Sequence, residues 1–181
     1  MKKVLLILAD GFEEIEALGT ADVLRRLGME VVLAGLSGEK VTGAHGMVIT
    51  SNAVLSAVAG ESFDAVVLPG GMPGSANLDQ SPLVTEVLAK ADRESAIIAA
   101  ICAAPFVLAK RGVLNGKKFT MYPGFDSELG GLKYTASPAE TDGRIVTGKG
   151  PGAVFDFAFH LATALGMKSE CEKLYQGMFI R

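Results

Sequence analysis

The first apolar run of the chain reads Val4-Leu5-Leu6-Ile7-Leu8-Ala9, and Asp10-Gly11 closes it. A run this short and this continuous predicts a strand that is covered on both faces, as in a parallel sheet. Residues 31–34, 65–68 and 96–101 have the same character, and each run ends at a glycine, a proline or another small residue. The chain is therefore expected to contain at least four parallel strands.

Helical segments alternate with these runs. We expect helices over residues 13–27, 82–92 and 103–111, and two closing helices over residues 153–165 and 169–178. The alternation predicts an α/β fold with a mostly parallel sheet and helices on both faces. Two stretches interrupt it and are interpreted as additions to the sheet. Residues 40–51 contain a hairpin turn at residues 43–46, and residues 118–147 contain short strand candidates around Phe119 and Ile145.

Size and charge exclude several classes of protein. The 181 residues and 18.8 kDa predict one domain over residues 1–181. Seventeen basic against 20 acidic residues give a net charge of −3, which disfavours nucleic acid and anionic membranes as partners. No run reaches the roughly 18 apolar residues that a membrane span needs. Two cysteines are too few for a disulfide framework, so a reducing, cytoplasmic location is expected without a secretory signal.

Cys102 follows the apolar run 96–101 and precedes a helix that Pro105 can start. A residue in such a tight strand-to-helix turn is presented as a nucleophile in nucleophile-elbow enzymes. Helix N-terminal amides would lower the pKa of the thiol and favour its reactive thiolate. A buried, inert core cysteine explains the position equally well, because cysteine is among the most buried residue types.

Glu16 lies near the end of the first strand. Asp10 and Glu13 have the spacing of a capping box, so Glu13 and Glu14 are explained as residues that start the helix. Glu16 instead shares a helical stripe with small or apolar residues, where burial would raise its pKa and keep a proton available for a neighbouring thiolate. The alternative is an ordinary solvated helix glutamate.

Pro69-Gly70-Gly71 follows the run 65–68. Backbone without side chains can direct its amides at a bound oxygen, as an oxyanion hole requires. A plain turn is the alternative interpretation of this glycine pair.

Together these motifs resemble the ThiJ/PfpI superfamily, in particular its DJ-one, deglycase-like branch. The resemblance covers essentially the whole chain and is carried by residues 5–16, 22–26, 66–71 and 99–105 and by Gly150-Pro151-Gly152. It implies a flavodoxin-like three-layer sandwich, similar to class I glutamine amidotransferases, and a homodimer.

The same resemblance assigns roles to individual residues. It implies that Cys102 is the nucleophile and that a protonated Glu16 is its hydrogen-bond partner. Gly70, Gly71 and Ala103 would line the oxyanion region, and Tyr122, Pro151 and Glu13 are candidates for the substrate pocket. No metal and no cofactor is implied.

Two positions depart from the pattern of the superfamily. Ala103 stands where the protease and chaperone-glyoxalase branches have a histidine after the nucleophile, so a Cys-His dyad and peptidase activity are not expected. Tyr122 precedes Pro123 where many members of the DJ-one branch have a histidine, and tyrosine, with a pKa near 10, is a poor base at neutral pH.

Two functions follow from these residues. In the first, Cys102 attacks a small aldehyde or dicarbonyl, or a glycated protein, without a cofactor. In the second, the protein is a non-catalytic redox sensor or chaperone whose Cys102 is oxidised to a sulfinate. Residues 143–149 mimic a phosphate-binding loop but are expected to form a strand, and the two histidines, His45 and His160, do not suggest a zinc site.

Overall fold

A seven-stranded sheet forms the centre of the protein, and the computed structural model describes residues 1–180. Every neighbouring pair of strands is parallel except the last pair, β9 and β8, which is antiparallel. The order across the sheet is β5 (Ala53–Val54), β2 (Glu30–Gly35), β1 (Lys3–Leu8), β6 (Ala65–Leu68), β7 (Ile97–Ile101), β9 (Ile145–Gly148) and β8 (Ala139–Asp142).

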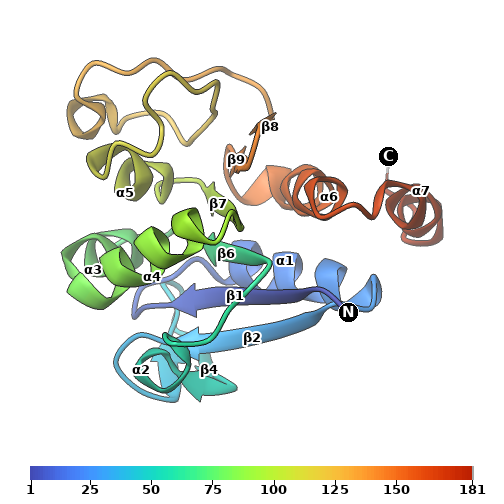
Figure 1. Cartoon of the computed structure of the whole chain (residues 1–181), viewed down its shortest axis with the longest axis horizontal. Helices are drawn as coiled ribbons and strands as arrows, with labels where there is room; N and C mark the ends of the chain where they lie inside the picture. Colours follow the sequence, from blue (N-terminus) through green and yellow to red (C-terminus); the bar gives the residue numbers. More distant parts are fainter. Residues whose placement is uncertain (181) are drawn as a thin grey trace.

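Helices cover both faces of this sheet (Figure 1). One face carries α2 (Leu55–Val58), α3 (Gly74–Gln80), α4 (Pro82–Arg93) and α5 (Pro105–Lys110), and the other carries α1 (Glu14–Arg26), α6 (Val154–Ala164) and α7 (Lys168–Gly177). Strand β1 is buried on both sides because alternate side chains point to opposite faces. Leu5 and Ile7 join the first core, and Leu6 and Leu8 join the second. The predicted α/β sandwich with a mostly parallel sheet is confirmed.

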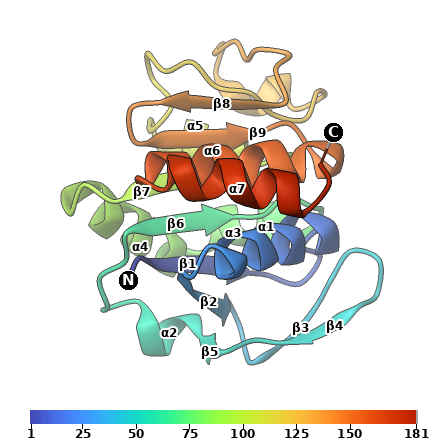
Figure 2. The same cartoon turned by 90° about the vertical axis from the view of Figure 1, so that its right-hand side faces the viewer.

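The four apolar runs predicted as strands and the five predicted helices are present, with ends shifted by at most two residues. The hairpin prediction is also correct, but its strands β3 (Lys40–Thr42) and β4 (Val48–Thr50) form a separate two-stranded sheet instead of extending the main one. Figure 2 shows that this hairpin lies on the side of the molecule toward which the arrows of strands β6 and β9 point.

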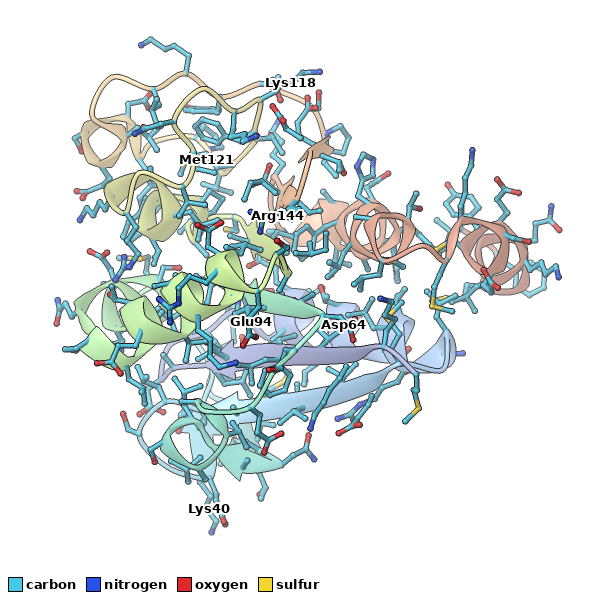
Figure 3. The ribbon with its side chains drawn as sticks, viewed as in Figure 1. Lys40, Asp64, Glu94, Lys118, Met121 and Arg144 are labelled. Carbon is cyan, nitrogen blue, oxygen red and sulfur yellow. The ribbon has the colours of Figure 1, made fainter. Side chains whose placement is uncertain are left out.

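The stretch 118–147 differs from the prediction. No strand forms around Phe119, where the described backbone has only an isolated bridge between Thr120 and Thr135. The strand that pairs with β9 is β8, which the sequence pattern does not reveal because it is short and half polar. Lys118, labelled in Figure 3, forms an ion pair with Glu140 of this edge strand at 3.2 Å, and charge of this kind protects an exposed sheet edge.

Strands β1, β6 and β7 end side by side because they are parallel neighbours. Glu13 and Glu16 follow β1 at the start of helix α1, Gly70 and Gly71 lie in the loop after β6, and Cys102 lies in the turn after β7. The fold therefore gathers the predicted site residues at one edge of the sheet, where open α/β folds bind ligands. Within residues 1–180, every helix is too short or too polar to cross a membrane.

Candidate active site

Helix α1 starts with Glu13 as its N-cap, and the Glu13 carboxylate accepts a hydrogen bond from the Glu16 amide at 2.7 Å. The predicted capping box with Asp10 is therefore wrong. The Asp10 carboxylate instead accepts a hydrogen bond from the Thr42 amide of the hairpin at 2.8 Å. The cap holds the first turn of α1 so that Glu16 faces the loop after β6.

Glu16 is buried, with 1% of its surface exposed, so the alternative of a solvated helix glutamate is excluded. Its Oε2 accepts a hydrogen bond from the Gly70 amide at 2.9 Å, whereas its Oε1 has no hydrogen-bond partner of good geometry among residues 1–180. Burial is the main cause that raises the pKa of Glu16 to about 7. A proton on Oε1 would turn this unpartnered oxygen into a hydrogen-bond donor.

Cys102 occupies the turn between β7 and α5 with φ at +64°, a left-handed conformation that is uncommon for a residue with a side chain. Two backbone hydrogen bonds of 2.9 Å hold it there: its amide donates to the Gly148 carbonyl, and its carbonyl accepts from the Tyr122 amide. Strain of this kind is retained where the surroundings over-determine it, and it is typical of functional sites. Cys102 is half-buried, in contrast to the buried Cys171.

The thiol of Cys102 and the carboxyl of Glu16 affect each other's proton affinity. Burial, the charge of an ionised Glu16 and a hydrogen bond to that carboxylate raise the pKa of Cys102 to about 12. The backbone amides of Gly71 and Ala103 oppose this rise. The predicted lowering of the thiol pKa by helix N-terminal amides is therefore outweighed beside an ionised Glu16. Helix α5 has only six residues, and the thiol is buried beside a carboxylate.

The two glycines after β6 have different tasks. Gly70 binds Glu16 through its amide, so this amide does not serve as an oxyanion donor as predicted. A side chain at Gly70 would also collide with Cys102, because an added Cβ would lie 2.5 Å from the Cys102 Cβ and 2.6 Å from the Glu16 Oε2. The amides that favour negative charge on the sulfur belong to Gly71 and Ala103.

Tyr122 and Pro151, two of the three predicted pocket residues, line one pocket of about 450 Å³. Glu13 does not line it and acts instead as the cap of α1. One wall of the pocket connects to the Cys102 turn through the hydrogen bond that the Tyr122 amide donates to the Cys102 carbonyl.

Glu14 and His45 form a contact that sequence reasoning did not foresee. The buried Glu14 carboxylate accepts hydrogen bonds from the His45 amide at 2.7 Å and from the Met47 amide at 3.4 Å, and it pairs with the His45 ring at 2.8 Å. Gly43 gives this carboxylate its space, since a Cβ there would lie 2.3 Å from Glu14 Oε1. The ligand-type atoms of Glu13, Glu14 and His45 lie within 4.8 Å of one another. The hydrogen bonds of Glu14 attach the hairpin to the start of helix α1.

The phosphate-loop mimic, His160 and Cys171, which were set aside from the sequence, have structural surroundings that explain them. Residues 145–148 of the phosphate-loop mimic are strand β9, as predicted. The His160 ring is 2.9 Å from the Thr141 hydroxyl, which is the ordinary partner expected for a helix histidine. Cys171 is buried in α7 against the second core.

Comparison with known proteins identifies relatives of the whole chain. The Drosophila melanogaster protein dj-1beta is 41% identical over 99% of this chain and 97% of its own, and its crystal structure matches with a TM-score of 0.94 at 99% and 98% coverage. A Caenorhabditis elegans protein named glutathione-independent glyoxalase DJR-1.2 is 36% identical, covering 90% of this chain and 87% of its own. A Pyrococcus abyssi protein named deglycase PYRAB04690 is 31% identical, covering 84% and 93%.

The family match agrees with the geometry. The pattern of the DJ-1/PfpI family extends over residues 2–164, from the first strand to the end of α6. This range includes the loops that bring Glu16, Gly71 and Cys102 together. The chain therefore belongs to the DJ-1/PfpI family.

Proposed function

We propose that this protein converts reactive 1,2-dicarbonyls such as methylglyoxal to 2-hydroxy acids without a cofactor, with Cys102 as nucleophile and Glu16 as proton carrier. The observation that carries the proposal is the buried Glu16 carboxyl, with an unpartnered oxygen and a pKa near 7, beside a strained Cys102. Relatives named as a glyoxalase and as a deglycase support the same chemistry, and glycated protein is the corresponding larger substrate.

The proton of Glu16 decides the reactivity of Cys102 in this proposal. With the proton on Glu16 Oε1, the negative charge that raises the thiol pKa is gone and the carboxyl donates a hydrogen bond to the sulfur. The amides of Gly71 and Ala103 then stabilise the thiolate. The two groups share one proton, so their titration belongs to the pair.

The reaction proceeds through a covalent thioester. The Cys102 sulfur bonds to the aldehyde carbon, whose oxygen takes a proton, and a hemithioacetal forms. Glu16 removes the proton from that carbon while the neighbouring ketone oxygen takes a proton, which gives an enediol. The former ketone carbon then takes a proton and the hydroxyl on the sulfur-bound carbon loses its proton, which gives the thioester of a 2-hydroxy acid. Water cleaves the thioester, releases the hydroxy acid and restores the thiol. The net reaction adds one water to the dicarbonyl.

Peptidase chemistry has less support. Ala103 follows Cys102, and both histidines of the chain have other partners, His45 with Glu14 and His160 with Thr141. A Cys-His dyad would need an imidazole at the sulfur.

The test is formation of lactate from methylglyoxal by the purified protein. Lactate is measured because reversible hemithioacetal formation alone would consume methylglyoxal without turnover. We expect many lactates per protein for the wild type and for Cys171→Ala, the matched control, and none above background for Cys102→Ala. If the wild type makes no lactate while Cys102 still reacts with iodoacetamide, the enzyme proposal fails and the redox-sensor interpretation takes its place.

We also propose that the protein is a homodimer. The large exposed side chains of Ile15, Met47 and Val48 lie on α1 and on the hairpin, which Glu14 holds together. Exposed apolar groups from adjoining elements are typical of a protein-protein contact. Light scattering at micromolar concentration should give twice 18.8 kDa, and a mass of 18.8 kDa would refute the dimer.

A further inference from the structure

We propose that Glu13 is a positioning residue for the Cys102 reaction: its negative charge keeps the proton that Glu16 and Cys102 share on Glu16, which leaves the sulfur as a thiolate. The inference rests on the proposed function, because it concerns how the same pair is prepared for attack. It gives Glu13 a task beyond that of capping helix α1.

A closed ring of hydrogen bonds joins Glu13 to Glu16 and to the loop after β6. The Glu13 amide donates to the Gly70 carbonyl at 2.9 Å, and the Gly70 amide donates to Glu16 Oε2 at 2.9 Å. The Glu16 amide closes the ring by donating to Glu13 Oε2 at 2.7 Å. Each residue of the ring donates one bond and accepts another, so the ring fixes the Glu13 carboxylate and the Glu16 carboxyl relative to each other.

The charge of Glu13 is held in the interior without a cation. Glu13 is buried, with 7% of its surface exposed, so salt and water screen its charge only weakly. The His45 ring of the same cluster pairs with Glu14 at 2.8 Å. Among residues 1–180, no lysine, arginine or histidine forms an ion pair with Glu13. The charge is therefore free to act on the proton of its neighbour Glu16.

Glu13 acts on Glu16 more strongly than on Cys102. Burial is the main cause that raises the pKa of Glu16, and the charge of Glu13 raises it further. The largest causes that raise the pKa of Cys102 are burial and Glu16 itself. A charge that raises the proton affinity of one member of a coupled pair moves the shared proton to that member. Glu13 thus favours a protonated Glu16 beside a Cys102 thiolate.

Other titratable groups on the elements around the start of α1 do not replace Glu13. Lys3 lies at the start of β1, at the opposite end of the strand from the site, and pairs with Glu30 and Glu61. The remaining groups are exposed to water, which screens their charge: Asp10 after β1, Glu30 on β2, His45 in the hairpin, and Asp156 and His160 on α6.

The test is the rate at which iodoacetamide alkylates Cys102 between pH 5 and 8.5 in the wild type and in Glu13→Gln. Glutamine can still accept the hydrogen bond of the Glu16 amide, but it has no charge. In the wild type the rate should rise with pH as the thiolate forms and level off near pH 7, where Glu16 ionises. Without the charge of Glu13, Glu16 ionises at lower pH, so the rate should level off earlier.

The expected rates of Glu13→Gln and the wild type are equal at pH 5, and the rate of Glu13→Gln is about 10-fold lower at pH 8, since a pKa change of one is a tenfold change in ionisation. Glu86→Gln is the matched control, because it removes an exposed charge from α4 and should keep the wild-type profile. Equal rates at pH 8, or an equal loss at both pH values, would overturn the inference. An equal loss would mean that Glu13 has only a structural role.

A second pair of variants separates charge from capping even if Glu13→Gln does not fold. Aspartate and asparagine are both among the best N-cap residues and differ in charge. We expect Glu13→Asp to keep the wild-type profile and Glu13→Asn to lose rate at pH 8 only. The same profile in both variants would contradict the inference.

Two backgrounds show through which group Glu13 acts. In Glu16→Gln there is no proton to hold, so Glu13→Gln should leave the labelling profile unchanged, and a remaining loss at pH 8 would overturn the inference. In His45→Gln the loss at pH 8 should persist, and its disappearance would assign the effect to His45. Labelling does not require turnover. A Glu13 effect in a protein that makes no lactate would overturn the proposed function only, and lactate formation without a Glu13 effect would overturn this inference only.

Discussion

Glu16→Gln should make the protein more stable at alkaline pH. In the wild type, burial raises the pKa of Glu16 from 4.5 to about 7. A raised pKa in the folded state means that the stability contributed by the protonated carboxyl is complete below pH 4.5 and is lost as the pH rises through about 7. Glutamine cannot ionise, but its carbonyl can accept the Gly70 hydrogen bond and its amide can face the sulfur.

The size of the effect follows from the two pKa values. At 1.36 kcal/mol per pH unit, the ionised Glu16 costs about 3 kcal/mol at pH 8.5. A domain of this size gains ~2–4 °C in Tm for each kcal/mol, so Glu16→Gln should melt about 6–12 °C higher than wild type at pH 8.5. Near pH 4.5 the two melting temperatures should converge.

The assay is chemical and thermal unfolding of both proteins between pH 4.5 and 8.5, repeated in a Cys102→Ala background. The repeat shows whether Cys102 affects the ionisation of Glu16. The hydrogen bond with Cys102 lowers the pKa of Glu16, so Cys102→Ala should move the loss of stability to higher pH. Equal stability of wild type and Glu16→Gln at pH 8.5 would refute the reasoning. It would mean that the pair loses its first proton at an ordinary carboxyl pKa.

Four further predictions concern neighbouring groups. Graded peroxide should oxidise the half-buried Cys102 before the buried Cys171, because its sulfur is more accessible, and peptide mass spectrometry that found Cys171 oxidised first would contradict this. Gly70→Ala should lower hydroxy acid formation ~100-fold by displacing Cys102 and Glu16, whereas Gly60→Ala, with open space, should have no effect. His45→Gln should lower Tm at pH 5.5 but not at pH 8.5. Glu14 raises the pKa of His45, so the stability that the ion pair contributes is lost as the pH rises through the His45 pKa. An equal loss of Tm at both pH values would exclude the ion pair as the source of the effect. Tyr122→His should raise kcat for methylglyoxal by as much as ~10²–10⁴ if a general base is missing there, and an unchanged kcat with normal Cys102 labelling would indicate that Glu16 carries every proton.

The fold could be predicted from the sequence because its signals are local. Four short apolar runs with helices between them indicate a parallel sheet, regardless of which strands pair with each other. Each of the four runs forms a strand. The stretch 118–147 could not be predicted in the same way. Strand β8 is stabilised by pairing with β9, and this partner is close in space only after the chain has turned at Gly143.

The sequence predicted that Cys102, Glu16 and the glycines after the third apolar run lie close together, but not the electrostatics of this group. Cys102 and Glu16 could be selected because one follows a strand and the other interrupts an apolar helix face. Their pKa values depend on how deeply both are buried and on which amides reach them, and these are properties of several segments at once. For the same reason the Gly70 amide, expected as an oxyanion donor, was found to bind Glu16.

The amino-acid sequence by itself determined the alternation of strands and helices, the two chemical groups of the site and the small residues around them. Only the tertiary structure decided that Glu13 caps α1 in place of Asp10, that Glu14 reaches His45 in the hairpin, and that Tyr122 and Pro151 share one pocket. Periodicity and turn residues act over a few neighbouring positions, so a sequence displays them directly. The contact between Glu14 and His45, and the pocket that Tyr122 and Pro151 both line, join residues about 30 positions apart. They exist only once the folded sheet has brought these segments together.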